Sequence, residues 1–123
     1  MYLNEDQVKS RLKLGKPVEQ WLGIREEVEY TVLKWLRIDK ERNNTFTVAY
    51  FECFDEGNED FTDVYEFSML DTDEPFGLLK EFDSVNEALT FSIDTYQASF
   101  VKFVSGGMIQ DDYLGYLNYK LSK

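Results

Sequence analysis

The 123-residue sequence has no histidine, one cysteine, two prolines and only 13 basic residues against 24 acidic ones. The absence of histidine excludes Ser-His-Asp and Cys-His nucleophiles, imidazole acid–base catalysis and histidine-ligated metals. The formal net charge of −11 disfavours contact with phosphate backbones, so direct binding of DNA or RNA is not expected. Any enzymatic chemistry in this chain would therefore rest on carboxylates.

The single cysteine and the lack of long apolar runs indicate the cellular compartment that we expect for this protein. Cys53 has no partner for an intrachain disulfide, and the adjacent carboxylate of Glu52 disfavours a reactive thiolate. No apolar stretch approaches the roughly 18 residues of a membrane-spanning helix, and the first residues lack the features of a signal peptide. We therefore expect a cytoplasmic protein with no membrane contact.

Length and composition predict a single domain over residues 1–123. Apolar residues make up 43% of the chain and aromatic residues 16%, which is typical of a folded protein with a core despite the high charge. The sequence has no Walker loop, dinucleotide fingerprint, nucleophile elbow or cysteine pair. No cofactor is therefore expected.

The charge of the chain is concentrated in its second part. Residues 1–42 carry nine basic and eight acidic side chains, whereas residues 43–123 carry four and sixteen. Between Glu52 and Asp94 there are fourteen acids and one base, Lys80. The negative electrostatic field of these residues favours a basic partner and speeds its association. The alternative is that the negative charge only keeps the protein soluble.

Capping residues and hydrophobic spacing predict three helices and a short helical turn. Asn4 with Gln7, and Ser84 with Glu87, have the spacing of capping boxes. A proline and a glycine also stand at the two ends of the expected helical turn. The predicted helical ranges are 4–14, 17–22, 84–97 and 110–121.

Runs of β-branched and aromatic residues predict the sheet. The range 27–40 fits helical and strand periodicity alike, and we interpret it as a strand because an Arg-Asn-Asn turn signal follows it. The ranges 45–54 and 61–70 are further predicted strands, and 78–82 is a short fourth candidate. The predicted fold class is α+β, with a three- or four-stranded antiparallel β-meander packed against N- and C-terminal helices on one face.

The strand register follows from the pairing that gathers apolar side chains on one face. A three-residue loop with Asn44 in the left-handed region places Lys34 opposite Glu52. Pairing of the second and third predicted strands then places Glu52 opposite Asp63. A charged row, Lys34–Glu52–Asp63, is therefore predicted to cross an otherwise apolar sheet face.

This charged row is the arrangement in the sequence best suited to acid–base chemistry. Two adjacent carboxylates can share a proton, which raises one pKa, and a pocket lined by Tyr50 and Tyr65 would accommodate a small ligand. The commoner arrangement is a salt-bridged row in which Lys34 neutralises Glu52. The sequence therefore favours a non-catalytic protein, and an enzyme would use Glu52, Asp63 and Lys34.

The acidic segment 55–63 offers oxygen ligands of the kind that calcium and magnesium take. The candidate ligands are Asp55, Glu59 and Asp60. Gly57 is the third residue counted from Asp55, whereas the calcium-loop pattern needs glycine at the sixth position. A solvated acidic loop is the commoner outcome, so no metal is predicted.

A second apolar patch is predicted on the sheet face that the helices leave open. It consists of Trp35, Phe51 and Val64. A patch of this kind indicates another layer, a dimer interface or a partner surface. We interpret it as an interface, which predicts a homodimer.

Two stretches of the chain resemble small conserved cyanobacterial proteins of uncharacterised function. They are FDEGNEDFTDVYEF at residues 54–67 and GMIQDDY at residues 107–113. The resemblance spans about residues 45–117 and contains no catalytic signature. It implies a cytoplasmic α+β protein and assigns no activity and no functional residue.

These observations predict a non-catalytic interaction or regulatory module whose acidic surface binds a basic protein partner. The alternative is a small-ligand binder or carboxylate-based enzyme with a pocket at the sheet face. A third hypothesis, binding of a divalent cation at residues 55–63, predicts that calcium or magnesium raises the melting temperature.

Overall fold

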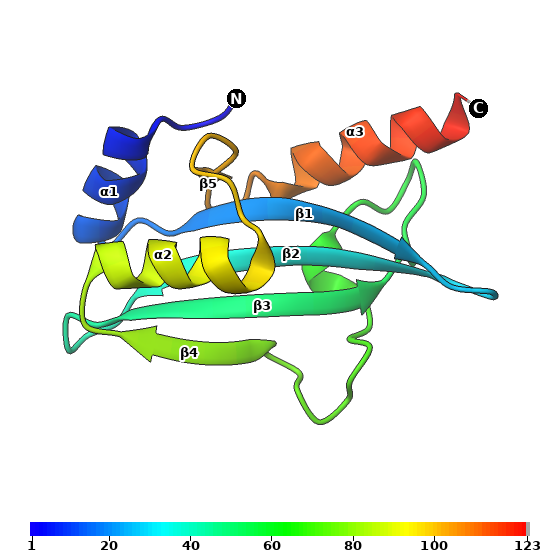
Figure 1. The fold of residues 1–123 in the computed structure, drawn as a ribbon. Helices are drawn as coiled ribbons and strands as arrows, with labels where there is room; N and C mark the ends of the chain where they lie inside the picture. Colours follow the sequence, from blue (N-terminus) through cyan, green and yellow to red (C-terminus); the bar gives the residue numbers. More distant parts are fainter. Residues whose placement is uncertain (123) are drawn as a thin grey trace.

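The computed structural model describes residues 1–122 as a five-stranded antiparallel sheet with helices on both faces (Figure 1). The strand order is β4-β3-β2-β1-β5. The strands are β1 (Val18–Glu26), β2 (Thr31–Lys40), β3 (Phe46–Phe54), β4 (Leu78–Phe82) and β5 (Val104–Ser105). The helices are α1 (Glu5–Lys13), α2 (Val85–Tyr96), α3 (Ile109–Leu121) and a 3₁₀ turn, η1 (Val64–Glu66). Within residues 1–122, no helix has the length and apolar character needed to cross a bilayer.

Strand alternation sends the side chains of β2 to two separate cores. Leu36 and Ile38 point to the face covered by α1 and α2, which we call the α2 face. Leu33 and Trp35 point to the opposite face, the α3 face, which α3 and the segment around η1 cover. The predicted α+β class with an antiparallel sheet is thus confirmed. The sheet has five strands instead of three or four, and the helices do not share one face.

The hairpin of β2 and β3 has the predicted register. Lys34 lies opposite Glu52, and Asn44 adopts the left-handed conformation with φ of 66°. The Glu41 amide donates to the Thr45 carbonyl at 2.8 Å, which closes a three-residue loop between them. The ambiguous range 27–40 is therefore a strand from Thr31 onward, as predicted.

The range 17–22 is a strand, and the prediction of a helical turn there is wrong. Its residues form most of β1, which pairs with β2 along its length and with β5 at its start. Buried polar side chains alternate along β1: Glu19 points to the α3 face and Gln20 toward the carbonyl of Ser99 on the other side. A β-bulge between Trp21 and Gly23 shifts the register, and Gly23 has φ of 117°, which favours glycine.

The range 61–70 is not a strand, so the second predicted hairpin is also wrong. A single bridge, Cys53 to Met69, joins this segment to β3, and η1 interrupts it. Val64 and Phe67 turn inward and complete the core on the α3 face, which an extended strand at the sheet edge would not do. The strand beside β3 is β4, the short fourth candidate.

Two of the helices begin at the predicted caps. The Asn4 side chain accepts from the Gln7 amide at 2.8 Å, and the Gln7 side chain accepts from the Asn4 amide, which completes a capping box. Ser84 accepts from the Glu87 amide at 3.1 Å, while the Glu87 carboxylate accepts from the Asp83 amide at 3.2 Å. These contacts fix the start of α2 beside the end of β4.

Candidate functional site

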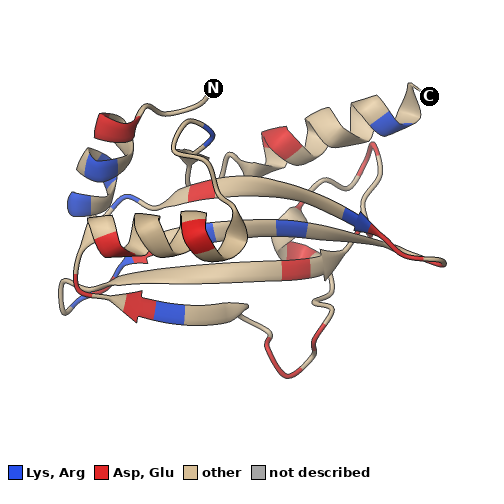
Figure 2. Cartoon of the chain, viewed as in Figure 1, with Lys and Arg blue, Asp and Glu red and all other residues tan. Residues whose placement is uncertain are grey.

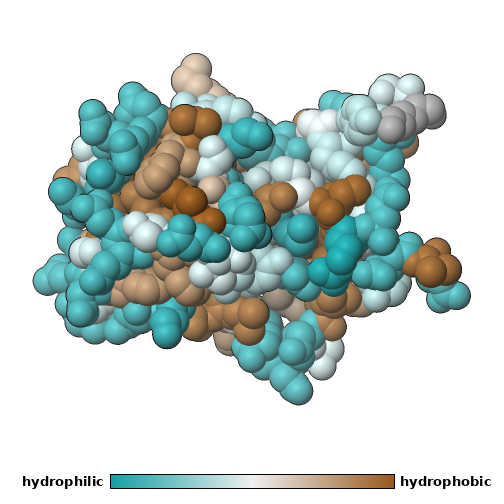
Figure 3. Space-filling model, in the orientation of Figure 1, coloured by the Kyte–Doolittle hydropathy of each residue, from teal (hydrophilic) through white to brown (hydrophobic). Residues whose placement is uncertain are grey.

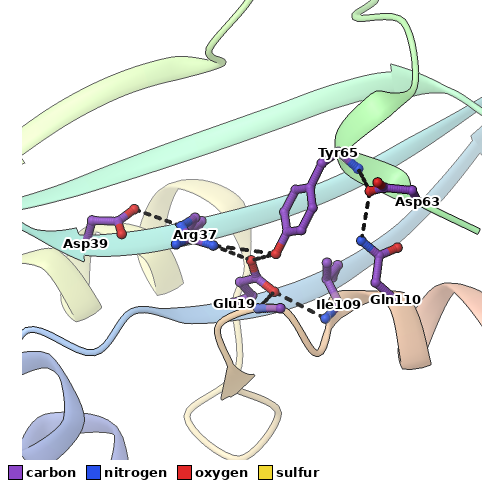
Figure 4. Close-up of polar contacts among 8 residues, drawn as sticks. Glu19, Arg37, Asp39, Asp63, Tyr65, Ile109 and Gln110 are labelled. Atoms are coloured by element: carbon purple, nitrogen blue, oxygen red, sulfur yellow. Dashed lines mark hydrogen bonds and ion pairs between the residues drawn. The ribbon is translucent and has the colours of Figure 1, made fainter.

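The predicted charged row is reduced to two residues in the structure. Lys34 lies opposite Glu52, but Asp63 lies at the start of η1 on the α3 face. There its carboxylate accepts from the Tyr65 amide at 3.1 Å and from the Gln110 side chain at 3.2 Å (Figure 4). The prediction that Asp63 neighbours Glu52 is wrong because it depended on a strand over 61–70.

Glu52 is an ionised, hydrogen-bonded carboxylate. Burial alone would raise its pKa, but a hydrogen bond from the Tyr50 hydroxyl at 2.7 Å and the Arg25 guanidinium at 3.4 Å hold the pKa below its ordinary value. Burial, together with the bond to Glu52, raises the pKa of Tyr50. Glu52 therefore sits in a salt bridge beside a neutral phenol, and it does not share a proton with a second carboxylate.

Two hollows adjoin Glu52 and Tyr50. The first has a volume of about 350 Å³ and lies beside the end of α2, where Tyr96 stacks on Tyr50 with ring centroids 4.1 Å apart. The second, of about 180 Å³, opens toward the loop before β4. Lys34 also lines the first hollow; its charge helps to lower the pKa of Glu52, although within residues 1–122 it makes no direct ion pair. This hollow can accommodate a small anion.

The candidate metal ligands do not converge. The buried carboxylate of Asp55 accepts a hydrogen bond from the Tyr113 hydroxyl at 2.6 Å and pairs with Lys120 at 3.4 Å. Glu59 and Asp60 are exposed on the loop that follows. In the described part of the chain, no three acidic or cysteine side chains lie close enough to hold a metal ion.

The predicted apolar patch is covered by the chain itself. Trp35 and Val64 are 3% and 2% exposed, and Phe51, which stacks on Trp35 at 4.1 Å, is half-buried. The segment predicted as a third strand folds over this face and leaves a cavity of about 240 Å³. The additional layer is therefore part of the same chain, and the interface prediction for Trp35 and Val64 is wrong.

A buried ionic cluster around Glu19 is the feature that sequence reasoning missed (Figure 4). Glu19 is fully buried, and one carboxylate oxygen accepts from Arg37 at 2.7 Å and from the Tyr65 hydroxyl. The other oxygen accepts from the backbone amides of Gly107 at 2.9 Å and Ile109 at 3.2 Å. These contacts join β1, β2, η1 and the start of α3. Because four donors already satisfy the Glu19 carboxylate, it has no free capacity to accept a hydrogen bond from a substrate.

Sequence signals for this cluster were weak because its members lie far apart in the chain. Glu19 falls in the range predicted as helical, where it would have been exposed. Recognition of that range as a strand would have placed Glu19 on the same face as Trp21 and hence in a core. Nothing in the sequence pairs it with Tyr65 or Gly107.

Three acidic residues without an ion pair in the described part of the chain line a hollow at the β4 edge of the sheet. A hollow of about 620 Å³ lies between β4 and α2; we call it the α2–β4 groove. Its lining consists of Glu81, Phe82, Asp83, Asn86, Glu87, Thr90 and Phe91. Three of these residues are acidic and none is basic.

The groove is lined by acidic residues and by two aromatic rings. The rings of Phe82 and Phe91 lie 4.9 Å apart, and both side chains are half-buried. Figure 2 shows the acids at the end of β4 and the start of α2, with further acids on the loop that precedes β4. In Figure 3 hydrophobic surface is visible below α2 between hydrophilic groups. Such a surface suits a ligand that carries both positive charge and apolar groups.

Comparison with known proteins adds no assignment to this geometry. No protein-family model, curated protein or solved structure matches the chain. The resemblance to small cyanobacterial proteins therefore stays an expectation.

Proposed function

We propose that this protein is a non-catalytic interaction module that binds a basic segment of a partner protein in the α2–β4 groove. The observation that carries the proposal is the lining of the groove. Asp83 and Glu87 adjoin Phe82 and Phe91, Glu81 contributes to the lining from the edge strand β4, and no base is among the lining residues. Lysine and arginine side chains complement this surface because their charged ends pair with carboxylates while their methylene stems pack on aromatic rings.

The spacing of the acids favours a peptide segment over a single ion. Within residues 1–122, no three acidic side chains converge closely enough to hold a metal ion. The groove acids come from the end of β4, the turn after it and the first turn of α2, so they are spread over successive parts of the chain and do not converge on one point. Several cationic groups carried on one chain match this arrangement.

A binding titration tests the proposal. The probe is a fluorescein-labelled peptide, KVKTVTK, blocked at both ends, and the measurement is fluorescence anisotropy at low and at roughly 0.15 M salt. The groove variant carries Glu81→Gln, Asp83→Asn and Glu87→Gln. The matched control carries Glu29→Gln, Glu59→Gln and Asp60→Asn, which remove the same charge from exposed positions at the other end of the sheet.

We expect the groove variant to weaken binding by about tenfold or more, because it removes the paired charges at the contact surface. The control variant is expected to weaken binding by less than about threefold, through the general field alone. The peptide EVETVTE is expected not to bind. Equal losses in the two triple variants, or no binding of KVKTVTK at low salt, would contradict the proposal.

A small-ligand site beside Glu52 is a second candidate function. It is supported by the hollow of about 350 Å³ and by the ammonium of Lys34, which makes no ion pair within the described residues. A small anion bound there would raise the melting temperature. If inorganic phosphate raises it equally in the native protein and in a Lys34→Met variant, this site does not bind the anion.

A further inference from the structure

The strand β4 forms an open edge of the sheet. It is the terminal strand in the order β4-β3-β2-β1-β5, and Figure 1 shows no element beyond it. An uncovered edge of this kind presents unpaired amide and carbonyl groups, which can pair with a strand from another chain. Because β4 also borders the α2–β4 groove, its edge lies next to the proposed binding surface.

The outward-facing backbone groups of β4 can be identified from β3. The Phe54 amide donates to the Ser68 carbonyl at 2.9 Å, so even-numbered residues of β3 direct their backbone groups to the β4 side. The register between β3 and β4 is unbroken and pairs even-numbered residues with one another. The amides and carbonyls of Leu79 and Glu81 therefore point away from β3, to the free edge.

Exposed apolar side chains accompany these groups. Leu78 and Leu79 are 49% and 60% exposed, and Phe76 just before the strand is 76% exposed. Leu78 and Leu79 lie on opposite faces of the sheet, because successive side chains of a strand alternate. A strand added at this edge would bury apolar surface on both faces.

We infer that β4 binds an extended basic segment of the partner as an additional antiparallel strand. This inference rests on the proposed function, because charge identifies the occupant. Glu81 lies in β4 and Asp83 directly follows the last residue of that strand, so a basic residue opposite Glu81 and a second one two positions before it in an antiparallel partner lie near both acids. The residue between, and those opposite Leu79 and Leu78, would be apolar or β-branched.

A second copy of this chain fits the edge poorly. Each copy carries a net charge of −11, and acids flank β4 on the loop before it and the turn after it. An antiparallel pair of β4 strands centred on Lys80 would also place the two copies of that lysine opposite each other, which is destabilising. A basic segment relieves the repulsion that a second copy would increase.

Backbone methylation of the probe KVKTVTK tests the inference. Aligned with its second lysine, the third residue, opposite Glu81, the peptide directs its third and fifth amides toward Glu81 and Leu79 of β4, and its fourth and sixth amides away. One variant is N-methylated at the third and fifth amides, and the matched control is N-methylated at the fourth and sixth. Both keep the charge and side chains of the parent peptide.

We expect methylation at the third and fifth amides to weaken binding at least about tenfold, and the control methylation to weaken it less than about threefold. We also expect hydrogen exchange of the Leu79 and Glu81 amides, followed by NMR, to slow when the parent peptide binds. On the protein side, Leu79→Pro is expected to bind more weakly than Leu79→Ala, because proline also removes the outward amide.

The outcomes separate this inference from the proposed function. If the parent peptide binds in the groove but both methylated peptides bind equally well, strand addition is wrong and the basic-segment proposal stands. Unchanged exchange at Leu79 and Glu81 in the saturated complex leads to the same conclusion, and it does not depend on the folding of any variant. If the parent peptide does not bind, both proposals are wrong.

Discussion

The α3 face and the α2–β4 groove contain carboxylates in opposite environments. On the α3 face, Glu19 is fully buried with four donors, and the buried carboxylate of Asp55 accepts from Tyr113 and Lys120. In the groove, Glu81 and Asp83 are exposed, and no side-chain ion pair holds either of them within residues 1–122. The net charge of the chain therefore comes from two kinds of acid.

This contrast shows why charge alone does not locate a site. A buried carboxylate must have donors, because its desolvation would otherwise cost several kcal/mol. Such a group stabilises the fold and is not available to a partner. An exposed carboxylate that forms no ion pair contributes little to stability and keeps its capacity to pair, so the groove is where binding is expected.

Substitution of Glu19 is expected to have the largest effect. Glu19→Ala leaves the amides of Gly107 and the buried Ile109 without their acceptor, and it leaves Arg37 with Asp39 as its one remaining carboxylate partner. We expect a loss of about 3–5 kcal/mol in the free energy of unfolding, measured by urea denaturation. Glu59→Gln, on the exposed loop, is the control and should change it by less than about 0.5 kcal/mol. If Glu19→Ala lowers the free energy of unfolding as little as the control does, the claim that the buried carboxylates stabilise the fold is contradicted.

The hydroxyl of Tyr113 tests the second buried carboxylate. Tyr113→Phe removes the 2.6 Å hydrogen bond to Asp55 and keeps the ring in its place between Phe67 and Trp21. We expect a loss of about 1–2 kcal/mol by the same measurement, because a charged acceptor loses its donor. Tyr2→Phe removes an exposed hydroxyl and should have no measurable effect. If the two variants are equally stable, the Tyr113 bond does not contribute.

Local sequence signals were enough for part of the fold. The hairpin of β2 and β3 was predictable because its loop, the left-handed Asn44 and the facing pair Lys34–Glu52 lie within one short stretch. The starts of α1 and α2 were predictable because a cap depends on residues three positions apart. The accumulation of acids between Glu52 and Asp94 was visible in the same way.

The other parts of the fold depend on contacts between residues that lie far apart in the sequence. Pro17 and Gly23 resemble the ends of a helical turn, yet pairing with β2 makes that range a strand. The range 61–70 is apolar enough for a strand, but Val64 and Phe67 instead pack with Trp35 in the core on the α3 face. The groove could not be predicted because it needs β4 beside β3, which the sequence alone did not indicate.

Glu52 is more exposed than Glu19 but, unlike the groove acids, it forms an ion pair. Its contribution to the free energy of unfolding should depend on pH. Its folded-state pKa is lowered, so its stabilising effect is present above the unfolded pKa of about 4.3 and is lost as the pH falls through the folded value. We expect Glu52→Gln to lower the free energy of unfolding by about 0.5–1 kcal/mol at neutral pH. This difference should shrink below about pH 4. A difference that is constant with pH would contradict the assignment of Glu52 as an ionised partner of Arg25.

Neutralising the groove acids is expected to change stability least. In the variant Glu81→Gln, Asp83→Asn, Glu87→Gln, the new glutamine at position 87 keeps an oxygen that can accept from the amide of residue 83 at the start of α2. Relief of repulsion in a chain of charge −11 should offset the small losses, so we expect a change within about 0.5 kcal/mol, or a slight gain at low salt. The measurement is urea denaturation at two salt concentrations. A loss of about 2 kcal/mol or more would mean that these acids hold the fold as Glu19 does, and weaker peptide binding by this variant could then no longer be attributed to lost charge in the groove.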